Sequence, residues 1–216
     1  MSKKELIKRY IIFTIGLFIM SMGISLMVKA KLGTSPISSI PYVVSLKMTS
    51  VSLGTLTFIW NMILIAGQMI ILGRKFEKYQ LIQIPISVLF GGFVDFSKSM
   101  LYFVNPRTYG GCIFTLVLGC FTLALGVSMT VLADVILNSG EGFVKAVTVK
   151  TGKEFGSMKV VFDVSLVILS VAAALLFFKK VVGVREGTII AAIISGFIIK
   201  FFNRSLKRGI DKWAAA

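Results

Sequence analysis

The stretch GISLMVKAKLGTSPISSIP, residues 23–41, interrupts what begins as a membrane-spanning helix. An apolar run over residues 10–28 leads into it, and two lysines, a glycine, small hydroxyl residues and two prolines follow. About a hundred residues later GVSMTVLADVILNSGEGF, residues 126–143, opens in the same way and is interrupted at the corresponding place. The same kind of interruption thus occurs once in each half of the chain, and the expected fold is derived from these two interruptions.

The composition around the breaks is that of a helical membrane protein. Of the 216 residues 56% are hydrophobic and only 15% are charged, and the mean hydropathy of +0.90 lies far above that of a soluble domain. The formal net charge of +15 fits lysines and arginines that flank membrane spans and meet anionic lipid headgroups. We therefore expect the lipid bilayer as a partner and do not expect nucleic acid.

Six apolar stretches are long enough to cross the hydrocarbon core, which needs about 20 helical residues. The interrupted segment 29–50 separates the first two stretches, and its counterpart 133–155 separates the fourth and fifth. Each interrupted segment contains a short apolar piece that is too brief to cross. If both termini are placed in the cytoplasm, the cytoplasmic segments contain more lysine and arginine than the external ones. This distribution favours the orientation with both termini in the cytoplasm. The spans are expected at residues 10–28, 53–72, 81–102, 109–132, 156–178 and 187–202.

Residue types that carry catalysis or bind metals are scarce in this chain. It has no histidine, and its two cysteines, Cys112 and Cys120, are eight residues apart in one expected span, about 12 Å along a helix and too far for a disulfide. No motif for a nucleotide, a cofactor or a metal is present, and no catalytic pair lies in the spans. We expect no cofactor, no metal and no enzymatic activity.

An internal repeat relates the two halves of the chain. Residues 16–30 and 119–133, compared at a shift of 103, share six identities in fifteen positions. Weaker matches follow in the same order at shifts of 102 and 104. Each half holds three crossings and one broken segment, and since three is odd, the second half must be inverted relative to the first. We expect an all-α polytopic membrane protein of six transmembrane helices in two inverted repeats, residues 1–106 and 107–216.

The breaks have a physical reason if the short pieces are half-helices that start inside the membrane. Backbone groups freed by a break need protein or a water-filled cavity around them, and a half-helix N terminus presents a partial positive charge to that cavity. In the first segment Thr34 or Ser35 is the expected cap, and Pro36 the first helical residue. The alternative is an ordinary polar loop with a short interfacial helix. The second segment offers Asn138 or Ser139 as the cap, followed by Gly140 and Glu141.

Two polar residues lie at matching depth in the spans. At a shift of 102, Asn61 in the second span corresponds to Asp163 in the fifth, and intramembrane polar groups commonly face a cavity or a partner. The alternative for Asn61 is a hydrogen bond between helices. For Asp163 it is an ion pair with Lys159, four residues earlier on the same helix face. Near the end of the third span we expect Asp95 to form an interfacial pair with Lys98, and the alternative is a proton site.

Three segments of the chain resemble a known family. They are GLFIMSMGISLMVKAKLGTSPISSIPYVVS, SLGTLTFIWNMILI and GGFVDFS, and they are similar to the YczE/YitT-like group of bacterial integral membrane proteins. In that group a Gly-rich first helix leads into an LG-x-x-P break, small residues open the second helix, and G-x-x-x-D closes the third. The resemblance implies a location in the bacterial cytoplasmic (inner) membrane and a family of unknown function for which transport is often considered. The matching residues are Leu32, Gly33, Pro36, Ser52, Gly54, Gly91 and Asp95.

We expect a small secondary transporter or facilitator for a small organic solute with an anionic group, worked by rocking one repeat against the other. The half-helix N termini favour an anion. Alternatives are a substrate-capture subunit of a vitamin importer, for which an inverted repeat is not needed, and a non-transporting membrane scaffold. A homodimer is compatible with the sequence, which indicates neither substrate nor coupling ion. The expected solute-binding residues are Thr34, Ser35, Pro36, Asn61, Asn138, Ser139, Gly140, Glu141 and Asp163.

Overall fold

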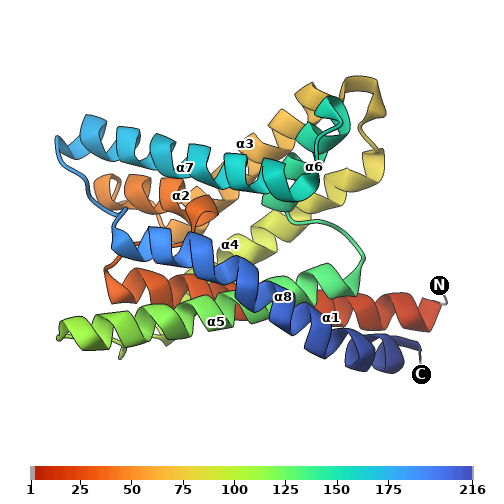
Figure 1. The fold of residues 1–216 in the computed structure, drawn as a ribbon, viewed down its shortest axis with the longest axis horizontal. Coiled ribbons are helices and arrows are strands. Elements are labelled where there is room, and N and C mark those ends of the chain that lie inside the picture. The colour runs from red at the N-terminus through yellow and green to blue at the C-terminus, as the bar shows by residue number, and fades with distance from the viewer. Residues whose placement is uncertain (1–2, 216) are drawn as a thin grey trace.

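A computed structural model describes residues 3–215, and over those residues the chain forms α-helices, two short 3₁₀ helices and no strand (Figure 1). The 3₁₀ helices, Gly73–Lys75 and Lys78–Ile82, connect α3 to α4. The α-helices are α1 (Lys3–Ala30), α2 (Pro36–Lys47), α3 (Leu53–Leu72), α4 (Gln83–Met100), α5 (Tyr109–Ala133), α6 (Ser139–Thr151), α7 (Phe155–Phe178) and α8 (Glu186–Ala215).

Six of these helices, α1, α3, α4, α5, α7 and α8, are long and apolar enough to cross a membrane, so the chain is a multi-pass membrane protein. The helices α2 and α6, with 12 and 13 residues, reach only about 20 Å against a hydrocarbon core of about 30 Å. The six expected spans are confirmed, but two have different ends: α1 already begins at Lys3, and α8 continues to Ala215. Lysine and arginine are good helix formers, so a helix continues past the apolar run that hydropathy detects.

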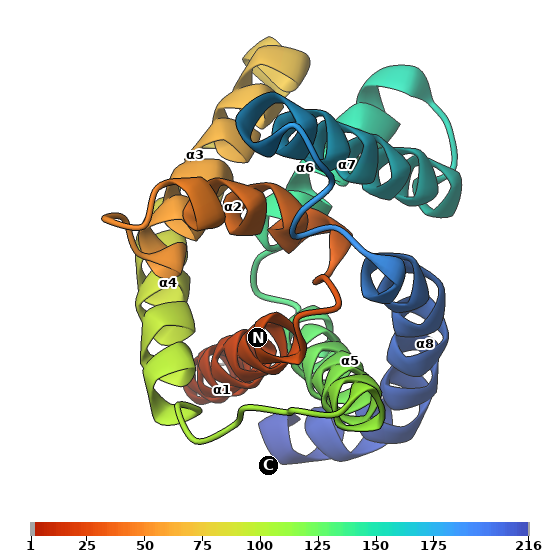
Figure 2. The ribbon, with the colours of Figure 1, turned by 90° about the vertical axis from the view of Figure 1, so that its left-hand side faces the viewer.

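Contacts between helices divide the molecule into two groups. The first, which we call the α1 group, consists of α1, α4, α5 and α8, and the second, the α2 group, consists of α2, α3, α6 and α7. In Figure 1 the α2 group lies above the α1 group, and Figure 2 shows the same division from the end of the molecule. The largest buried apolar cluster is centred on α1 and α5 and also includes Tyr42 of α2 and Leu53 of α3, whereas a smaller one lies among α3, α6 and α7.

The α1 group is built on a close antiparallel crossing of α1 and α5. Gly16 of α1 lies against Gly126 of α5, and Gly23 lies against Gly119, in reverse order along the two helices. A Cβ atom on Gly23 would come within 2.4 Å of the backbone nitrogen of Leu123. Glycine at these positions lets the two backbones approach, which is how helices pack in membranes where no hydrophobic driving force is available.

Buried hydroxyl groups connect the outer helices of the α1 group to its centre. Ser25 on α1 donates to the backbone oxygen of Val94 on α4 at 3.4 Å. Ser128 on α5 donates to the backbone oxygen of Ile199 on α8 at 3.3 Å. The two bonds join matching helices of the two halves, because Ser25 and Ser128 correspond at the shift of 103.

The two groups meet mainly where α3 packs against α4. A Cβ atom on Gly54 would lie 2.1 Å from the backbone oxygen of Gly91, so the helices touch through their backbones there. Beside this contact, Ser52 Oγ donates to Asp95 Oδ2 at 2.5 Å, and the Gly54 N–H donates to Oδ1 at 2.7 Å. The expected ion pair between Asp95 and Lys98 is not formed among residues 3–215, because the carboxylate serves the N terminus of α3 instead.

The corresponding helices of the second half, α7 and α8, do not pack in this way over the described residues. Gly156 on α7 corresponds to Gly54, and its added Cβ would meet no other helix within 4 Å. The fold is therefore packed between α3 and α4 and unpacked between α7 and α8.

Candidate solute-binding site

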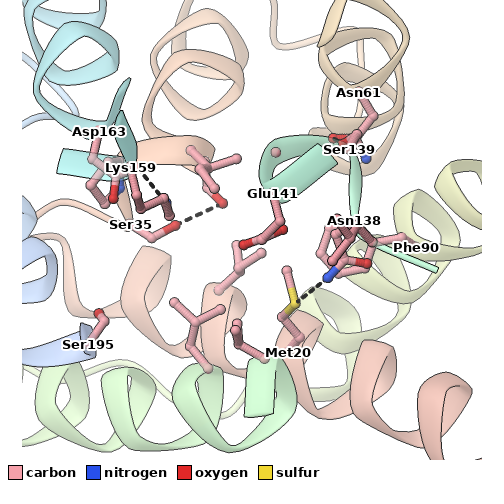
Figure 3. A pocket seen from close by; sticks show the side chains of 18 of the residues that line it. Met20, Ser35, Asn61, Phe90, Asn138, Ser139, Glu141, Lys159, Asp163 and Ser195 are labelled. Atoms are coloured by element: carbon pink, nitrogen blue, oxygen red, sulfur yellow. Dashed lines mark hydrogen bonds and ion pairs between the residues drawn. The ribbon is translucent and has the colours of Figure 1, made fainter. Parts of the chain in front are cut away.

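A cavity of about 410 Å³ lies between the two groups, and each of the eight α-helices contributes to its lining. The volume is in the range of sites for small organic molecules. Apolar side chains from α1 and α5, such as Leu17, Ile24 and Leu123, form one wall. The opposite wall comes from α2, α3, α6 and α7 and carries the ionisable side chains Glu141, Lys159 and Asp163 (Figure 3), together with apolar ones such as Ile37 and Val160. The cavity extends between α7 and α8, from Phe155 to Asn203, where those helices leave space.

The structure brings eight of the nine expected site residues to this cavity. The exception is Thr34, which is fully buried outside the lining, and its N–H donates to Thr188 Oγ1 at the start of α8, 3.3 Å away. Thr34 precedes the first helical turn by two residues and belongs to the connection between α1 and α2. The lining residues among the nine are Ser35, Pro36, Asn61, Asn138, Ser139, Gly140, Glu141 and Asp163.

The N termini of α2 and α6 both line the cavity. Ser35 is the cap of α2, with Pro36 as the first helical residue, and Asn138 is the cap of α6. Neither cap side chain accepts a backbone N–H of its own first turn: Ser35 Oγ donates to the Ser38 side chain at 3.1 Å, and Asn138 Nδ2 donates to a hydroxyl on α5. The first turn of α2 has no acidic residue, whereas that of α6 contains Glu141. The two helix starts therefore present different charges.

Asn61 joins α3 to the start of α6. Its Oδ1 accepts a hydrogen bond of 2.8 Å from Ser139 Oγ, and only 7% of its surface is exposed. Two residues from different halves, both expected at the site, are thus in direct contact at its edge. The helix–helix hydrogen bond considered for Asn61 from the sequence is present, and the residue lines the cavity as well.

Asp163 occupies the matching position on α7 and has a different partner. Lys159 Nζ donates to its Oδ1 at 2.6 Å, and the two side chains are 28% and 21% exposed. The ion pair that the four-residue spacing indicated is formed, and both members line the cavity. Asp163 has no donor from α2 because the residue of α2 that corresponds to Ser139 is Pro36, which lacks both a hydroxyl and an N–H.

Three buried polar atoms of the lining have no hydrogen-bond partner in the described structure: Trp60 Nε1, Glu141 Oε2 and Asn203 Oδ1. Glu141 lies on α6, outside the six spanning helices; burial raises the pKa of its carboxyl above the ordinary value, and the Lys159 ammonium opposes that shift. Sequence reasoning missed Trp60 and Asn203 as site residues. Tryptophan is common in membrane helices, and Asn203 lies one residue past the last expected apolar run, so neither position stood out.

No group of three or more His, Cys, Asp or Glu side chains within residues 3–215 could hold a metal ion. The polar atoms of the cavity are a carboxylate, an ion pair, hydroxyls, amides and one indole N–H. Such a lining can bind and orient a small polar molecule through hydrogen bonds and charge.

Comparison with known proteins finds relatives of this chain, all without an established role. The model of a family of unknown function, DUF6198, matches residues 7–204. The chain is 29% identical over 205 residues to the uncharacterized membrane protein YczE of Bacillus subtilis (strain 168), covering 92% of this chain and 87% of that protein. No solved structure matches.

Proposed function

The chain belongs to the YczE-like family of unknown function DUF6198, and on that premise we propose that it is a small secondary transporter or facilitator of the bacterial cytoplasmic membrane. Its cargo is a small organic solute with an anionic group, and its site is the cavity between the α1 and α2 groups. Both termini lie in the cytoplasm. The two halves, residues 1–106 and 107–216, are inverted repeats with α2 and α6 as half-helices.

Contacts at the crossing of α1 and α5 support the inverted repeat. At the shift of 103, Gly16 corresponds to Gly119 and Gly23 to Gly126. The contact of Gly16 with Gly126 is therefore the counterpart of the contact between Gly119 and Gly23. A pair of contacts that exchange under the repeat is what a pseudo-two-fold axis between antiparallel helices produces.

The helix ends before the two half-helices support it further. Lys31 and Asp134 correspond at the same shift, and both adopt the left-handed backbone region, with φ of 60° and 50°. Non-glycine residues are uncommon there. The backbone therefore leaves the ends of α1 and α5 with the same local conformation, although Lys31 and Asp134 differ in size and charge.

The observation that carries the proposal is the unequal packing of matching helices around one shared cavity. The space between α3 and α4 is closed by Gly54, Gly91 and Asp95, while the matching space between α7 and α8 is part of the cavity. A transporter with inverted repeats has two states in which the matching spaces exchange roles. With both termini in the cytoplasm, this structure is the state closed to the outside and open at the N-terminal end of α7, toward the cytoplasm.

The packing supports a different division of the moving parts from the one the sequence suggested. Each group contains helices of both halves, and most contacts between helices lie within a group. Motion of one whole repeat against the other would break the crossing of α1 and α5 and the contacts of α2 with α7 and α3 with α6. Rocking of the α2 group on the α1 group preserves all of these contacts. It changes only the boundary that contains the cavity.

The first test is a ligand screen on the purified full-length protein in detergent, followed by flux. Amino acids, vitamins and organic acids are added one at a time, and thermal unfolding is recorded. A solute at about one hundred times its dissociation constant should stabilise the protein by about 2.7 kcal/mol. Each hit is then loaded into proteoliposomes to measure whether it crosses the membrane.

Variants of the lining separate the site from the rest of the molecule. Asn61→Ala and Asp163→Asn should abolish the thermal shift and the flux, whereas Thr122→Ala, which removes a hydroxyl outside the lining, should leave both unchanged. A hit that binds but is never carried into vesicles would favour a capture subunit. A protein that neither binds nor carries any compound, and that loses stability in both site variants, would contradict the proposal and favour a scaffold.

A further inference from the structure

We infer that the solute carries a protonated amine in addition to its anionic group, and that Glu141 binds this amine. The inference rests on the proposed function and specifies its substrate as an amino-acid-like zwitterion with an apolar body. It is carried by the unpartnered polar atoms of the cavity, by the charges of its lining and by the difference between the two half-helix starts.

Three of the four buried side-chain polar atoms without a partner in the described structure line this one cavity. Buried polar groups in proteins are almost always hydrogen-bonded, and a cluster of exceptions is expected where a ligand supplies the partners. Two of the atoms, Glu141 Oε2 and Asn203 Oδ1, are oxygens that accept hydrogen bonds, and Trp60 Nε1 donates one. A ligand that satisfies all three must offer both donors and an acceptor.

The charges of the lining call for a cation. The cavity contains three ionisable side chains, namely Glu141, Asp163 and Lys159. Lys159 is committed to Asp163 at 2.6 Å, which leaves the Glu141 carboxylate without a direct ion-pair partner among the described residues. An unpaired carboxylate is costly in a low-dielectric site, so this carboxyl either holds its proton or releases it to become the partner of a bound cation. In a protein with a net charge of +15, the solute-binding cavity is thus acidic.

The N termini of α2 and α6 differ in charge, so the anionic group and the amine of the solute bind at different helix starts. The partial positive charge at the start of α6 already has the Glu141 carboxylate in its first turn, whereas the start of α2 at Ser35 and Pro36 has no acidic residue. An anionic group is therefore stabilised at α2 and an ammonium at Glu141. In Figure 3 the Glu141 side chain points into the space that separates Ser35 and the Lys159–Asp163 pair from Asn138.

The apolar wall from α1 and α5 determines the remaining part of the solute. Leu17, Ile24 and Leu123 offer no hydrogen-bonding side chain. A hydrocarbon side chain that packs against them is removed from water, which favours binding. The chemistry that matches all parts of the cavity is that of an aliphatic amino acid.

The test uses three probes that share one hydrocarbon skeleton: leucine, 3-methylbutylamine, which lacks the carboxylate, and 4-methylpentanoate, which lacks the amine. Binding to the full-length protein in detergent is measured by isothermal titration calorimetry. We expect leucine to bind most tightly and 4-methylpentanoate at least about tenfold more weakly, since one charged hydrogen bond is worth about 1.5–3 kcal/mol. Glu141→Gln keeps the shape of the side chain. It should weaken the two amines at least about tenfold and leave 4-methylpentanoate unchanged.

Glu154→Gln, an exposed carboxylate outside the lining, is the matched control and should change none of the three affinities. Unfolding temperatures of both variants show whether they are folded. The inference is overturned if 4-methylpentanoate binds as tightly as leucine, if Glu141→Gln binds leucine unchanged, or if none of the probes binds the native protein. In each of these cases the proposed function still stands if a solute from the wider screen is carried into vesicles. The proposed function is contradicted only if no solute from that screen is carried into vesicles.

Discussion

The carboxylate of Asp95 shows how a single residue holds the boundary between the two groups. It accepts from Ser52 Oγ and from the Gly54 N–H, so it caps the N terminus of α3 from a neighbouring helix. A negative charge at that end also interacts favourably with the helix dipole. The sequence suggested Lys98 as the partner because it is three residues away. The true partners lie 41 and 43 residues earlier and become neighbours only through the packing of α3 on α4.

Replacing Asp95 should therefore matter far more than replacing the lysine beside it. Asp95→Ala removes two charge-assisted hydrogen bonds, and because Ser52 is exposed to solvent, we expect a loss of about 2 kcal/mol in the free energy of unfolding. Lys98→Ala should change it by less than about 0.5 kcal/mol. Chemical unfolding of the purified variants in detergent measures both. Equal losses would mean that an Asp95–Lys98 pair forms after all.

Residue-level reasoning selected residues that mostly line the cavity, while their role in binding a solute stays a prediction. Asn61 and Asp163 stood out because a polar side chain in an apolar run needs a reason, Glu141 because it follows the expected cap of a half-helix, and all three line the cavity. Thr34 was wrongly expected in the lining, because a cap can be read from the sequence only to within a residue or two. Asn203 could not be found without knowing that α8 continues as a helix past the apolar run.

Helices and their order were largely predictable, and their partners were not. Hydropathy located all six spans, and the Gly-Thr-Ser-Pro segment located the start of α2. Nothing in the sequence required that α2 pack on α7 and α3 on α6, so that each packed group contains helices from both halves. Helix pairing depends on side-chain fit between distant segments, which one sequence does not display.

Gly126 tests whether the crossing of α1 and α5 is as close as the structure has it. A Cβ atom there would lie 2.4 Å from the backbone nitrogen of Met20, so Gly126→Ala must push the helices apart, and we expect a loss of about 2 kcal/mol. Gly92 on α4 is the matched control, because a Cβ atom there meets nothing within 4 Å. Alanine favours the helix by up to about 1 kcal/mol, so Gly92→Ala should be neutral or stabilising. Thermal unfolding distinguishes the two, and equal behaviour would contradict the crossing.

At the scale of the whole molecule, the structure is symmetric in its contacts within each group and asymmetric between the groups. Corresponding contacts recur at the crossing of α1 and α5 and in the serine bonds to α4 and α8. The boundary between the groups is not symmetric, since α3 packs against α4 but the corresponding helices α7 and α8 do not pack against each other. If the two halves are inverted repeats of a transporter, a second state with the two boundaries exchanged is expected. The asymmetry is thus the feature that most directly supports alternating access.

A cross-link across the open boundary should trap the opposite state. Gly156 and Ser195 correspond to Gly54 and Gly91, which touch in this structure, so cysteines at 156 and 195 meet only when α7 closes on α8. In a background of Cys112→Ser and Cys120→Ser, oxidation should link Gly156→Cys to Ser195→Cys slowly, as the closed form is visited, and should stop flux in proteoliposomes. Reduction should restore it. Ser21→Cys with Ser97→Cys is the control: those side chains are in contact within the α1 group, so they should link at once and leave flux intact.

The outcomes of that experiment distinguish a boundary between α7 and α8 that closes during transport from one that is permanently open. If the 156–195 link forms and flux continues, the closure of α7 on α8 is not part of the transport cycle. If no link forms under any condition while the control links, the two arrangements are not exchanged, and the cavity is a fixed pocket in a scaffold. Rocking of whole repeats predicts a further difference, because it moves α1 relative to α5 and keeps α7 and α8 in one body. In that case the 156–195 link should leave flux unchanged, whereas rocking of the α2 group on the α1 group requires that the link abolish it.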